Sequence, residues 1–229
     1  MTQKIKHLGI IMDGNRRWAK AMGKSQYDGH MAGANNIEVI VEAVADRKIP
    51  YLTFYSFSQE NWERPEAEVN NLLKVFRVML KSPVVERFKK NNIRMNMIGD
   101  YLRFPKDIVE DIEKLHEDTR NNSAMTVNFA LGYGGRDEIV RSVNRILAKN
   151  QGETGITAEM IADNLDTAGQ PDPDLLIRTG RVSRTSGFLL WQSIYAELYF
   201  SNSLWPDFNE KELQEALNWY DPDQRRFGK

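Results

Sequence analysis

The chain has 229 residues, of which 41% are hydrophobic and 28% charged, a composition typical of a globular protein. Its 31 Lys and Arg nearly balance its 32 Asp and Glu, and the net charge of -1 argues against a nucleic acid partner. Cysteine is absent, which excludes disulfides, thiolate metal sites and a Cys nucleophile and fits a reducing, cytoplasmic location. No apolar run approaches the length of a signal-peptide core or a membrane span, so we expect any membrane contact to be peripheral.

Six short apolar runs alternate along the chain with longer amphipathic segments. The runs lie at 8–12, 51–57, 93–98, 125–131, 175–177 and 197–200. Helical spacing of apolar residues predicts helices around 37–44, 69–80, 108–115 and 139–147, and Asn209 with Glu212 predicts the capping box of a last helix. This alternation predicts an α/β fold, with one domain over residues 1–229 and a central, mainly parallel, six-stranded sheet that has helices on both faces. Ligands of such folds bind at the carboxyl ends of the strands.

The first polar motif follows the first apolar run and reads Asp13-Gly14-Asn15-Arg16-Arg17-Trp18. Free N–H groups at a helix start bind phosphate, and Gly14 lets the backbone approach a ligand closely. The arginines can grip phosphate oxygens through paired hydrogen bonds, and Asp13 is placed to hold Mg²⁺ against a diphosphate. An ordinary turn with solvated charges explains these residues equally well.

The second motif, from Ser56 to Pro65, follows the second apolar run. Ser58, Asn61 and Arg64 can hydrogen-bond a diphosphate or position a substrate, and Trp62 offers a flat apolar wall. Taken alone, this motif is better explained as a strand-to-helix loop around an ordinary buried tryptophan.

The third motif, Arg178 to Gly187, follows the fifth apolar run and contains three arginines, at 178, 181 and 184, with no acidic residue among them. Unpaired arginine beside glycine at the end of a strand favours anion binding over a merely flexible basic loop. The three histidines lack metal-ligand spacing, and only His30, near the first motif, is a functional candidate.

Taken together, these segments resemble the cis-prenyltransferase family. The likeness extends from His7 to the C-terminus and is carried by ordered stretches, among them HLGIIMDGNRRWA, YSFSQENWERP, NFALGYGGRDEIV, DLLIRT, FLLWQ, YAELYF, LWPDF and RRFG. The resemblance implies a cis-prenyltransferase-like fold and Mg²⁺-dependent condensation of isopentenyl diphosphate with an allylic diphosphate such as farnesyl diphosphate. The implied product is a cis-polyprenyl diphosphate of the undecaprenyl type.

The resemblance also implies roles for single residues. Asp13 would be catalytic and would hold Mg²⁺ together with Glu197. The allylic diphosphate would be bound by Gly14, Asn15, Arg16, Arg17, Trp18 and His30. Asn61 would be catalytic, and the second substrate would be aligned by Ser58, Trp62 and Arg64 and held by Arg178, Arg184 and Ser186. The terminal segment at 226–228 resembles one that reaches a neighbouring subunit, so a homodimer is implied.

Two stretches depart from the family pattern. Gln26 stands where the family usually has Arg, with Lys24 as the nearest substitute. The third motif lacks the usual Gly, Glu and Asn and reads instead Arg181-Val182-Ser183-Arg184-Thr185-Ser186-Gly187.

Three alternatives therefore stay open: a short-chain or irregular prenyl coupler, a non-catalytic partner subunit of the same fold, and a generic phosphate-binding module. The retained Asp13 argues against the partner subunit. We expect an apolar channel for the growing chain along the helix faces at 41–44 and 72–80, and the sequence leaves product length and allylic starter open.

Overall fold

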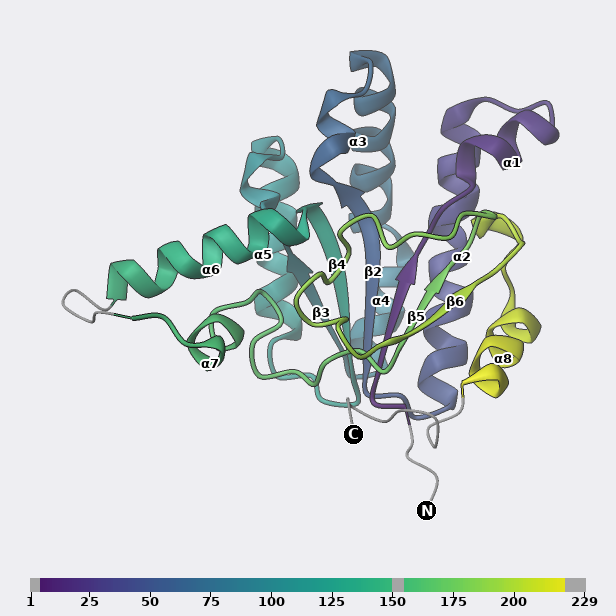
Figure 1. Cartoon of the computed structure of the whole chain (residues 1–229). Coiled ribbons are helices and arrows are strands. Elements are labelled where there is room, and N and C mark those ends of the chain that lie inside the picture. The colour runs from purple at the N-terminus through teal and green to yellow at the C-terminus, as the bar shows by residue number, and fades with distance from the viewer. Residues whose placement is uncertain (1–4, 150–154, 221–229) are drawn as a thin grey trace.

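A six-stranded sheet in the order β3-β4-β2-β1-β5-β6 runs through the middle of the protein (Figure 1). The structure is a computed structural model and describes residues 5–149 and 155–220. The strands are β1 (His7–Ile11), β2 (Tyr51–Ser58), β3 (Ile93–Ile98), β4 (Met125–Tyr133), β5 (Leu175–Arg178) and β6 (Glu197–Phe200). All neighbouring strands are parallel, so the six predicted strands are confirmed and the sheet is parallel throughout.

Helices occupy the connections that the apolar spacing indicates. They are α1 (Asn15–Ala21), α2 (Gln26–Asp46), α3 (Glu66–Leu80), α4 (Pro83–Lys90), α5 (Lys106–Thr119), α6 (Gly135–Lys149), α7 (Ala158–Ala162) and α8 (Glu210–Trp219), with the 3₁₀ helices η1 (Gln59–Glu63), η2 (Tyr101–Arg103) and η3 (Trp205–Asp207). The predicted capping box of α8 is confirmed, because Asn209 Oδ1 accepts from the Glu212 N–H and Glu212 Oε2 accepts from the Asn209 N–H. The sequence patterns did not reveal α4 and α7, which have too few turns to show a period.

The two faces of the sheet are covered differently. One face carries the main core, to which α2, α3, α4, α5 and α8 contribute side chains such as Ile40, Leu72 and Ile112. The opposite face carries a smaller core in which Phe188 and Leu189, from the irregular chain between β5 and β6, pack on β1, β4 and β5. The predicted sheet with flanking helices is confirmed, while irregular chain between β5 and β6 supplies the packing of this smaller core.

The strand order places the three polar motifs side by side. β1 lies between β2 and β5, and the carboxyl ends of all three strands meet at one edge because the strands are parallel. α1 and α3 rise from this edge (Figure 1), and the loop at 179–187 follows β5 there. In the described parts of the chain, no helix combines the length and apolarity that crossing a membrane requires.

Candidate active site

Asp13 lies just beyond β1 with an arginine on each of its carboxylate oxygens. Arg17 Nη2 is 2.9 Å from Oδ1, and Arg178 Nη2 is 3.0 Å from Oδ2. The Arg178 side chain is 7% exposed, whereas that of Asp13 is 29% exposed and is open to a ligand. These bonds join the loops after β1 and β5, so the predicted meeting of the first and third motifs is confirmed.

Contacts beneath Asp13 bind the same two loops together. Thr179 Oγ1 donates to the Asp13 carbonyl at 2.8 Å and accepts from the Asp13 N–H at 3.0 Å. Gly180 follows with a φ of 91°, and a Cβ at this position would lie 2.6 Å from Arg17 Nη2. Sequence reasoning passed over Thr179, although its position directly after Arg178 was a usable signal.

The loop after β5 wraps around the Arg178 guanidinium. Nη1 donates to the Arg184 carbonyl at 2.6 Å and to Ser186 Oγ at 2.8 Å. The Arg184 side chain itself is exposed. Arg181 Nε donates to the carbonyl of Asn202, which lies just after β6. The three arginines of the third motif thus do not form one trap, and Arg178 alone of them contacts the first motif.

The same loop holds several residues in the left-handed region. Arg181 has a φ of 59°, Ser186 of 51° and Leu189 of 45°, and Gly187 between them has a φ of 76°. Residues other than glycine adopt this backbone conformation at an energetic cost. The conformation persists only where the surrounding structure imposes it, often beside a binding site. Val182 is half-buried and Ser183 exposed, so these two departures from the family pattern lie at the loop surface.

Glu68, in the first turn of α3, pairs with two arginines, one on α1 and one just after η1. Its Oε1 is 2.7 Å from Arg64 Nη1, and its Oε2 is 3.1 Å from Arg16 Nη1. Glu68 is only 8% exposed, so these charge-assisted hydrogen bonds hold both guanidinium groups in place. The sequence analysis did not select Glu68, although the i,i+4 spacing from Arg64 on a helix start was a usable signal.

His30, on α2, lies next to this cluster. Burial, and then the positive charge of Arg64, lower the pKa of His30 to about 4, so the imidazole is neutral at physiological pH. Its Nε2 is buried and has no hydrogen-bond partner among the described residues. Burying such an atom without a partner is unfavourable, so this nitrogen is available to a bound ligand.

Ser58 and Asn61 bind each other at the end of β2. Asn61 Oδ1 accepts from the Ser58 N–H at 3.1 Å, and the Ser58 side chain accepts from the Asn61 N–H, a capping box that begins η1. The ligand-free geometry therefore assigns both residues to the local turn, and their roles toward a substrate stay predictions.

Neither predicted tryptophan lines the apolar cavity described below. The Trp62 ring packs against Phe57 and Phe104, with ring centroids 4.7 and 4.9 Å away, as an ordinary buried aromatic would. Trp18 Nε1 donates to Asp207 Oδ1 at 2.7 Å, and the Lys24 ammonium lies 5.1 Å from the Trp18 ring centroid. The roles of both tryptophans toward a substrate stay predictions, as does that of Lys24 as a substitute for the arginine missing at exposed Gln26.

An apolar cavity lies between the sheet and the helices α2, α3 and α4. It encloses about 930 Å³ of atom-free space, part of it open to solvent, and Asn15, His30 and Ser56 contribute polar atoms to its lining. The predicted α3 face is confirmed, since the lining includes Leu72, Val75, Phe76, Met79 and Leu80. The predicted contribution of Val41 and Val44 was wrong, because both are fully buried in the main core.

Glu197 lies at the opposite edge of the sheet from Asp13. It is the first residue of β6 and pairs with Leu175, whereas the carboxyl ends of the two strands pair Arg178 with Phe200. A single chain therefore does not bring Glu197 to Asp13, because parallel strands start and end at different edges, and the role of Glu197 toward a metal stays a prediction.

Residues 5–149 and 155–220 contain no group of three His, Asp or Glu side chains arranged to hold a metal ion. Asp13 nevertheless fits Mg²⁺, which commonly uses one or two protein carboxylates together with substrate phosphates. The segment at 226–228, on which the predicted reach into a second subunit rests, lies outside the described residues.

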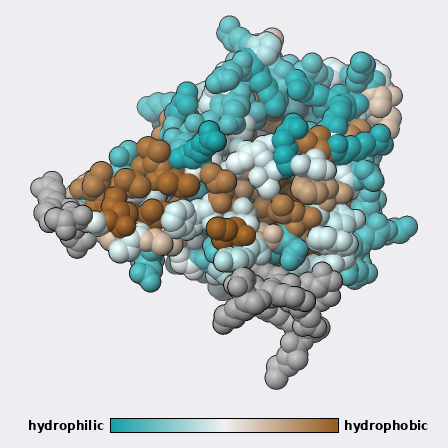
Figure 2. Space-filling view, viewed as in Figure 1, coloured by the Kyte–Doolittle hydropathy of each residue, from teal (hydrophilic) through white to brown (hydrophobic). Residues whose placement is uncertain are grey.

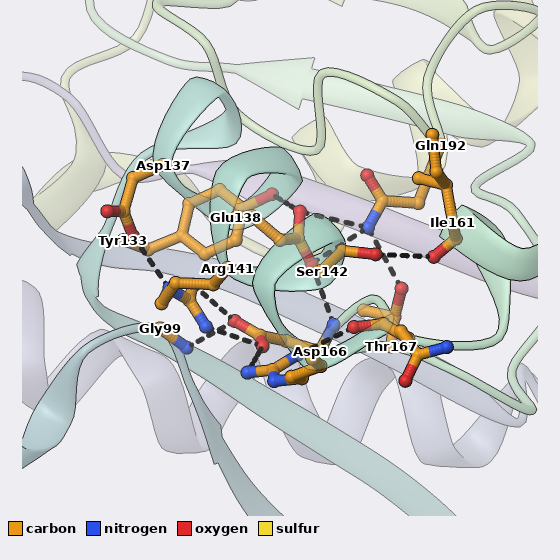
Figure 3. A network of polar contacts seen from close by, with 12 residues as sticks. Gly99, Tyr133, Asp137, Glu138, Arg141, Ser142, Ile161, Asp166, Thr167 and Gln192 are labelled. Carbon is orange, nitrogen blue, oxygen red and sulfur yellow. Dashed lines mark hydrogen bonds and ion pairs between the residues drawn. The ribbon is translucent and has the colours of Figure 1, made fainter. Parts of the chain in front are cut away.

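A buried polar network fastens α6 to the sheet and to the chain before β5 (Figure 3). Glu138 is fully buried and accepts hydrogen bonds from the Tyr133 hydroxyl, from Gln192 Nε2 at 3.2 Å and from the Asp166 N–H at 2.9 Å, and burial raises its pKa. Asp166 in turn binds both terminal nitrogens of Arg141 at 2.7 Å. Apart from Gln192 Oε1, which has no partner among the described residues, these groups satisfy one another, so we interpret the network as structural.

Comparison with known proteins gives a consistent picture. Residues 11–228 match the model of a family described as "Putative undecaprenyl diphosphate synthase". The chain is 45% identical over 223 residues to an isoprenyl transferase of Fusobacterium nucleatum, an alignment that covers 97% of this chain and 95% of the relative. It is 42% identical over 228 residues to an isoprenyl transferase of Porphyromonas gingivalis, which covers 98% of this chain and 89% of the relative.

Two solved structures share the fold. Lavandulyl diphosphate synthase from Lavandula x intermedia, in complex with dimethylallyl diphosphate, has a TM-score of 0.93 at 34% identity, with 99% of both chains covered. A probable undecaprenyl diphosphate synthase from Campylobacter jejuni has a TM-score of 0.84 at 34% identity, with 99% of this chain and 100% of that chain covered.

Proposed function

This chain belongs to the undecaprenyl diphosphate synthase family of isoprenyl transferases, and from that premise we propose that it condenses isopentenyl diphosphate with an allylic diphosphate such as farnesyl diphosphate. The product would be a longer cis-polyprenyl diphosphate. The observation that carries the proposal is the position of Asp13, which lies between Arg17 and Arg178 beside residues that line a large apolar cavity. A charged head and an apolar tail are the two parts of a prenyl diphosphate.

The reaction breaks the C1–O bond of the allylic substrate, and the electron pair leaves with the diphosphate. The double bond of isopentenyl diphosphate then attacks the allylic cation, and a proton is lost from the new intermediate. Positive charge and N–H groups fixed around the leaving diphosphate stabilise the transition state of the first step. The apolar cavity keeps water away from the cation, and the second substrate must be held at attack distance.

Each loop of the carboxyl edge has a task in this scheme. Gly14 and the free N–H groups at the start of α1 would receive the allylic diphosphate, together with Arg16, Arg17 and neutral His30. The isopentenyl diphosphate would be held by Arg178, Arg184 and Ser186, and loss of its proton would be assisted by Ser58, Asn61 and Arg64. Asp13 would hold Mg²⁺, which supplies further positive charge to the leaving group.

Incubation of the purified chain with farnesyl diphosphate, labelled isopentenyl diphosphate and Mg²⁺, followed by sizing of the products, tests the proposal. We expect a ladder of cis-polyprenyl products that Asp13→Ala reduces by at least about 100-fold, because removing an electrostatic catalytic group costs on the order of 3 kcal/mol or more. Asp46→Ala removes an exposed carboxylate at the C-terminal end of α2, and it should leave the product ladder unchanged. A wild-type chain as inactive as Asp13→Ala would refute the proposal and support a non-catalytic partner subunit.

A second candidate is an irregular or short-chain coupler. It is favoured by the TM-score of 0.93 with lavandulyl diphosphate synthase and by the departures from the family pattern between Arg181 and Gly187. Incubation with dimethylallyl diphosphate alone separates the two candidates. A branched ten-carbon product without long chains would favour the coupler, and a long-chain ladder formed only with isopentenyl diphosphate would favour elongation.

We also propose that the enzyme is a homodimer. β6 is an edge strand, and exposed apolar side chains lie on it and just before it, at Leu190, Ile194, Tyr195, Leu198 and Phe200, which we call the β6 patch. Figure 2 shows apolar side chains gathered along α6 and across the same face toward β6. An edge strand with an apolar surface is normally covered, and a second copy of the chain would cover this one.

A further inference from the structure

The hydroxyl of Ser56 has no partner although it is buried in the apolar cavity. Its Oγ is hidden from solvent and makes no hydrogen bond to any described residue. A buried hydroxyl without a partner costs roughly 1–3 kcal/mol, so such a group is expected to meet a ligand or a water molecule. Ser56 belongs to none of the roles assigned above.

Ser56 faces the cavity by the regular alternation of β2, in which Leu52 and Phe54 also face the helix-covered side. Tyr55 pairs with Ala130 on β4 and Phe57 pairs with the next residue, Leu131, so Ser56 is the extra residue of β2. Tyr55 faces the second side of the sheet, where its ring stacks on Phe188. Ser56 therefore lies on the helix-covered side, as alternation with Phe54 requires, and the bulge brings Phe57 to the same side.

The strand register places Ser56 where the charged loops meet the cavity. Tyr55 on β2 pairs with Ile11 on β1, so Ser56 is level with Met12 and one step from Asp13. Two other atoms of the same lining, Asn15 Oδ1 and His30 Nε2, are also buried without a partner. Asn15 Oδ1 is an acceptor, whereas the Ser56 hydroxyl and His30 Nε2, in the tautomer that protonates it, are donors that match a ligand with an anionic head and an apolar tail.

From this geometry we infer that Ser56 is a further substrate-binding residue, whose hydroxyl donates a hydrogen bond to the bridging C1–O oxygen of the allylic diphosphate. The inference rests on the proposed function. The allylic substrate is the one whose apolar tail must enter the cavity, and its bridging oxygen is the acceptor closest to the tail. A hydroxyl is suited to this oxygen because it adds a donor without adding charge to the apolar wall.

Equilibrium binding of farnesyl diphosphate, in the absence of isopentenyl diphosphate so that no turnover occurs, tests the inference. Ser56→Ala should weaken binding about 3- to 10-fold, the equivalent of about 0.5–1.5 kcal/mol for one hydrogen bond. Ser56→Thr, which keeps the hydroxyl, should restore most of the affinity. The affinity for isopentenyl diphosphate should be unchanged in both variants.

A ligand with sulfur in place of the bridging oxygen, farnesyl S-thiolodiphosphate, identifies the acceptor. Sulfur accepts hydrogen bonds weakly, so Ser56→Ala should weaken its binding much less than that of farnesyl diphosphate. Equal losses for both ligands, or a loss confined to isopentenyl diphosphate, would overturn the inference.

Ser82 offers a matched control inside the same cavity. The Ser82 Oγ is also buried without a partner among the described residues. Ser82 follows the C-terminal end of α3, and Glu68 lies at the N-terminal end of this helix, which is about 22 Å long. Ser82→Ala should leave farnesyl diphosphate binding unchanged. If Ser56→Ala binds like the wild type, the inference fails while the proposed function stands, whereas a wild-type chain that binds no farnesyl diphosphate would defeat the proposed function itself.

Discussion

Asp13 and Glu68 each hold two arginines, but their surroundings give them different tasks. The Asp13 side chain is 29% exposed, so a ligand can reach the arginine that Asp13 binds. Glu68, in contrast, is buried between Arg16 and Arg64. Because a diphosphate offers more negative charge and more acceptor oxygens than a carboxylate, it can draw Arg17 away from Asp13. Glu68 instead keeps its two guanidinium groups in place before a substrate arrives.

The meeting of Asp13 and Arg178 could be predicted from the sequence, because parallel strands bring the residues that follow them to one edge. Glu68 and Thr179 were missed because their importance comes from partners that are distant in the chain. Ser56 could not be predicted at all as a cavity residue. Alternation with Leu52 and Phe54 places it on the helix-covered side, but whether that side holds packed core or a cavity depends on how the helices pack, which no local pattern shows.

His7 makes the stability of the protein depend on pH. The ring is 1% exposed, Nδ1 lies 2.7 Å from the Pro171 carbonyl and Nε2 lies 2.7 Å from Thr53 Oγ1. Burial lowers the pKa of His7 from 6.5 to about 4. As pH falls below about 6.5, His7 becomes protonated in the unfolded chain but stays neutral in the folded chain. The free energy of unfolding should therefore fall by about 1.4 kcal/mol per pH unit because of this histidine.

Denaturant unfolding at pH 7 and at pH 5 measures this effect. We expect the wild type to lose stability between these values, with His30 adding to the loss because its pKa is also lowered. His7→Asn should be less stable than the wild type at pH 7 but should show a shallower pH dependence. Parallel stability curves for the two proteins would contradict the assignment of the pH dependence to His7.

α3 forms one wall of the apolar cavity along much of its length. Val75 and Met79 face the cavity, whereas Val78 is 46% exposed on the opposite side of the same helix. The helix positions thus alternate between the cavity and solvent within a single turn. A larger side chain on the inner face removes space from the cavity that we propose holds the growing chain, while the same change on the outer face does not.

Met79→Trp should therefore shorten the products by one or more isoprene units while the first condensation continues. Sizing of the products after complete reaction measures the change, and Val78→Trp on the outer face is the matched control. The product distribution of Val78→Trp should equal that of the wild type. Equal distributions for all three proteins would show that the cavity along α3 does not hold the growing chain.

Most elements could be predicted from periodicity, since each strand of the described sheet corresponds to an apolar run. The covering of the second face could not, because Phe188 and Leu189 lie in irregular chain that has no repeating pattern. The position of Glu197, in contrast, was available from the sequence. The first residue of a parallel strand lies at the edge away from the carboxyl ends, and the run at 197–200 begins with it.

At the scale of the whole molecule, the β6 patch is the main test of assembly. Ile194 is 75% exposed, and Leu198 and Phe200 lie nearby on or beside the edge strand. We expect the wild type to have the mass of two chains in light scattering at micromolar concentration. Ile194→Asp combined with Leu198→Asp should halve that mass, because burying two carboxylates at an interface is strongly unfavourable.

Val39→Asp provides the control for this experiment. Val39 is 47% exposed on α2, outside the β6 patch, so the substitution adds a charge without touching the proposed interface. Its mass should remain that of two chains. A wild type with the mass of one chain would contradict the homodimer.

The bond between Arg178 and Asp13 spans 165 residues of sequence. No local segment of the chain can form this bond, because it requires β1 to pair with β5, and most of the chain lies between these two strands in the sequence. Closing so long a loop is among the slower events in folding. Enzyme activity during refolding should consequently return last, after helix content and compactness, and an early intermediate would be well structured yet unable to turn over substrate.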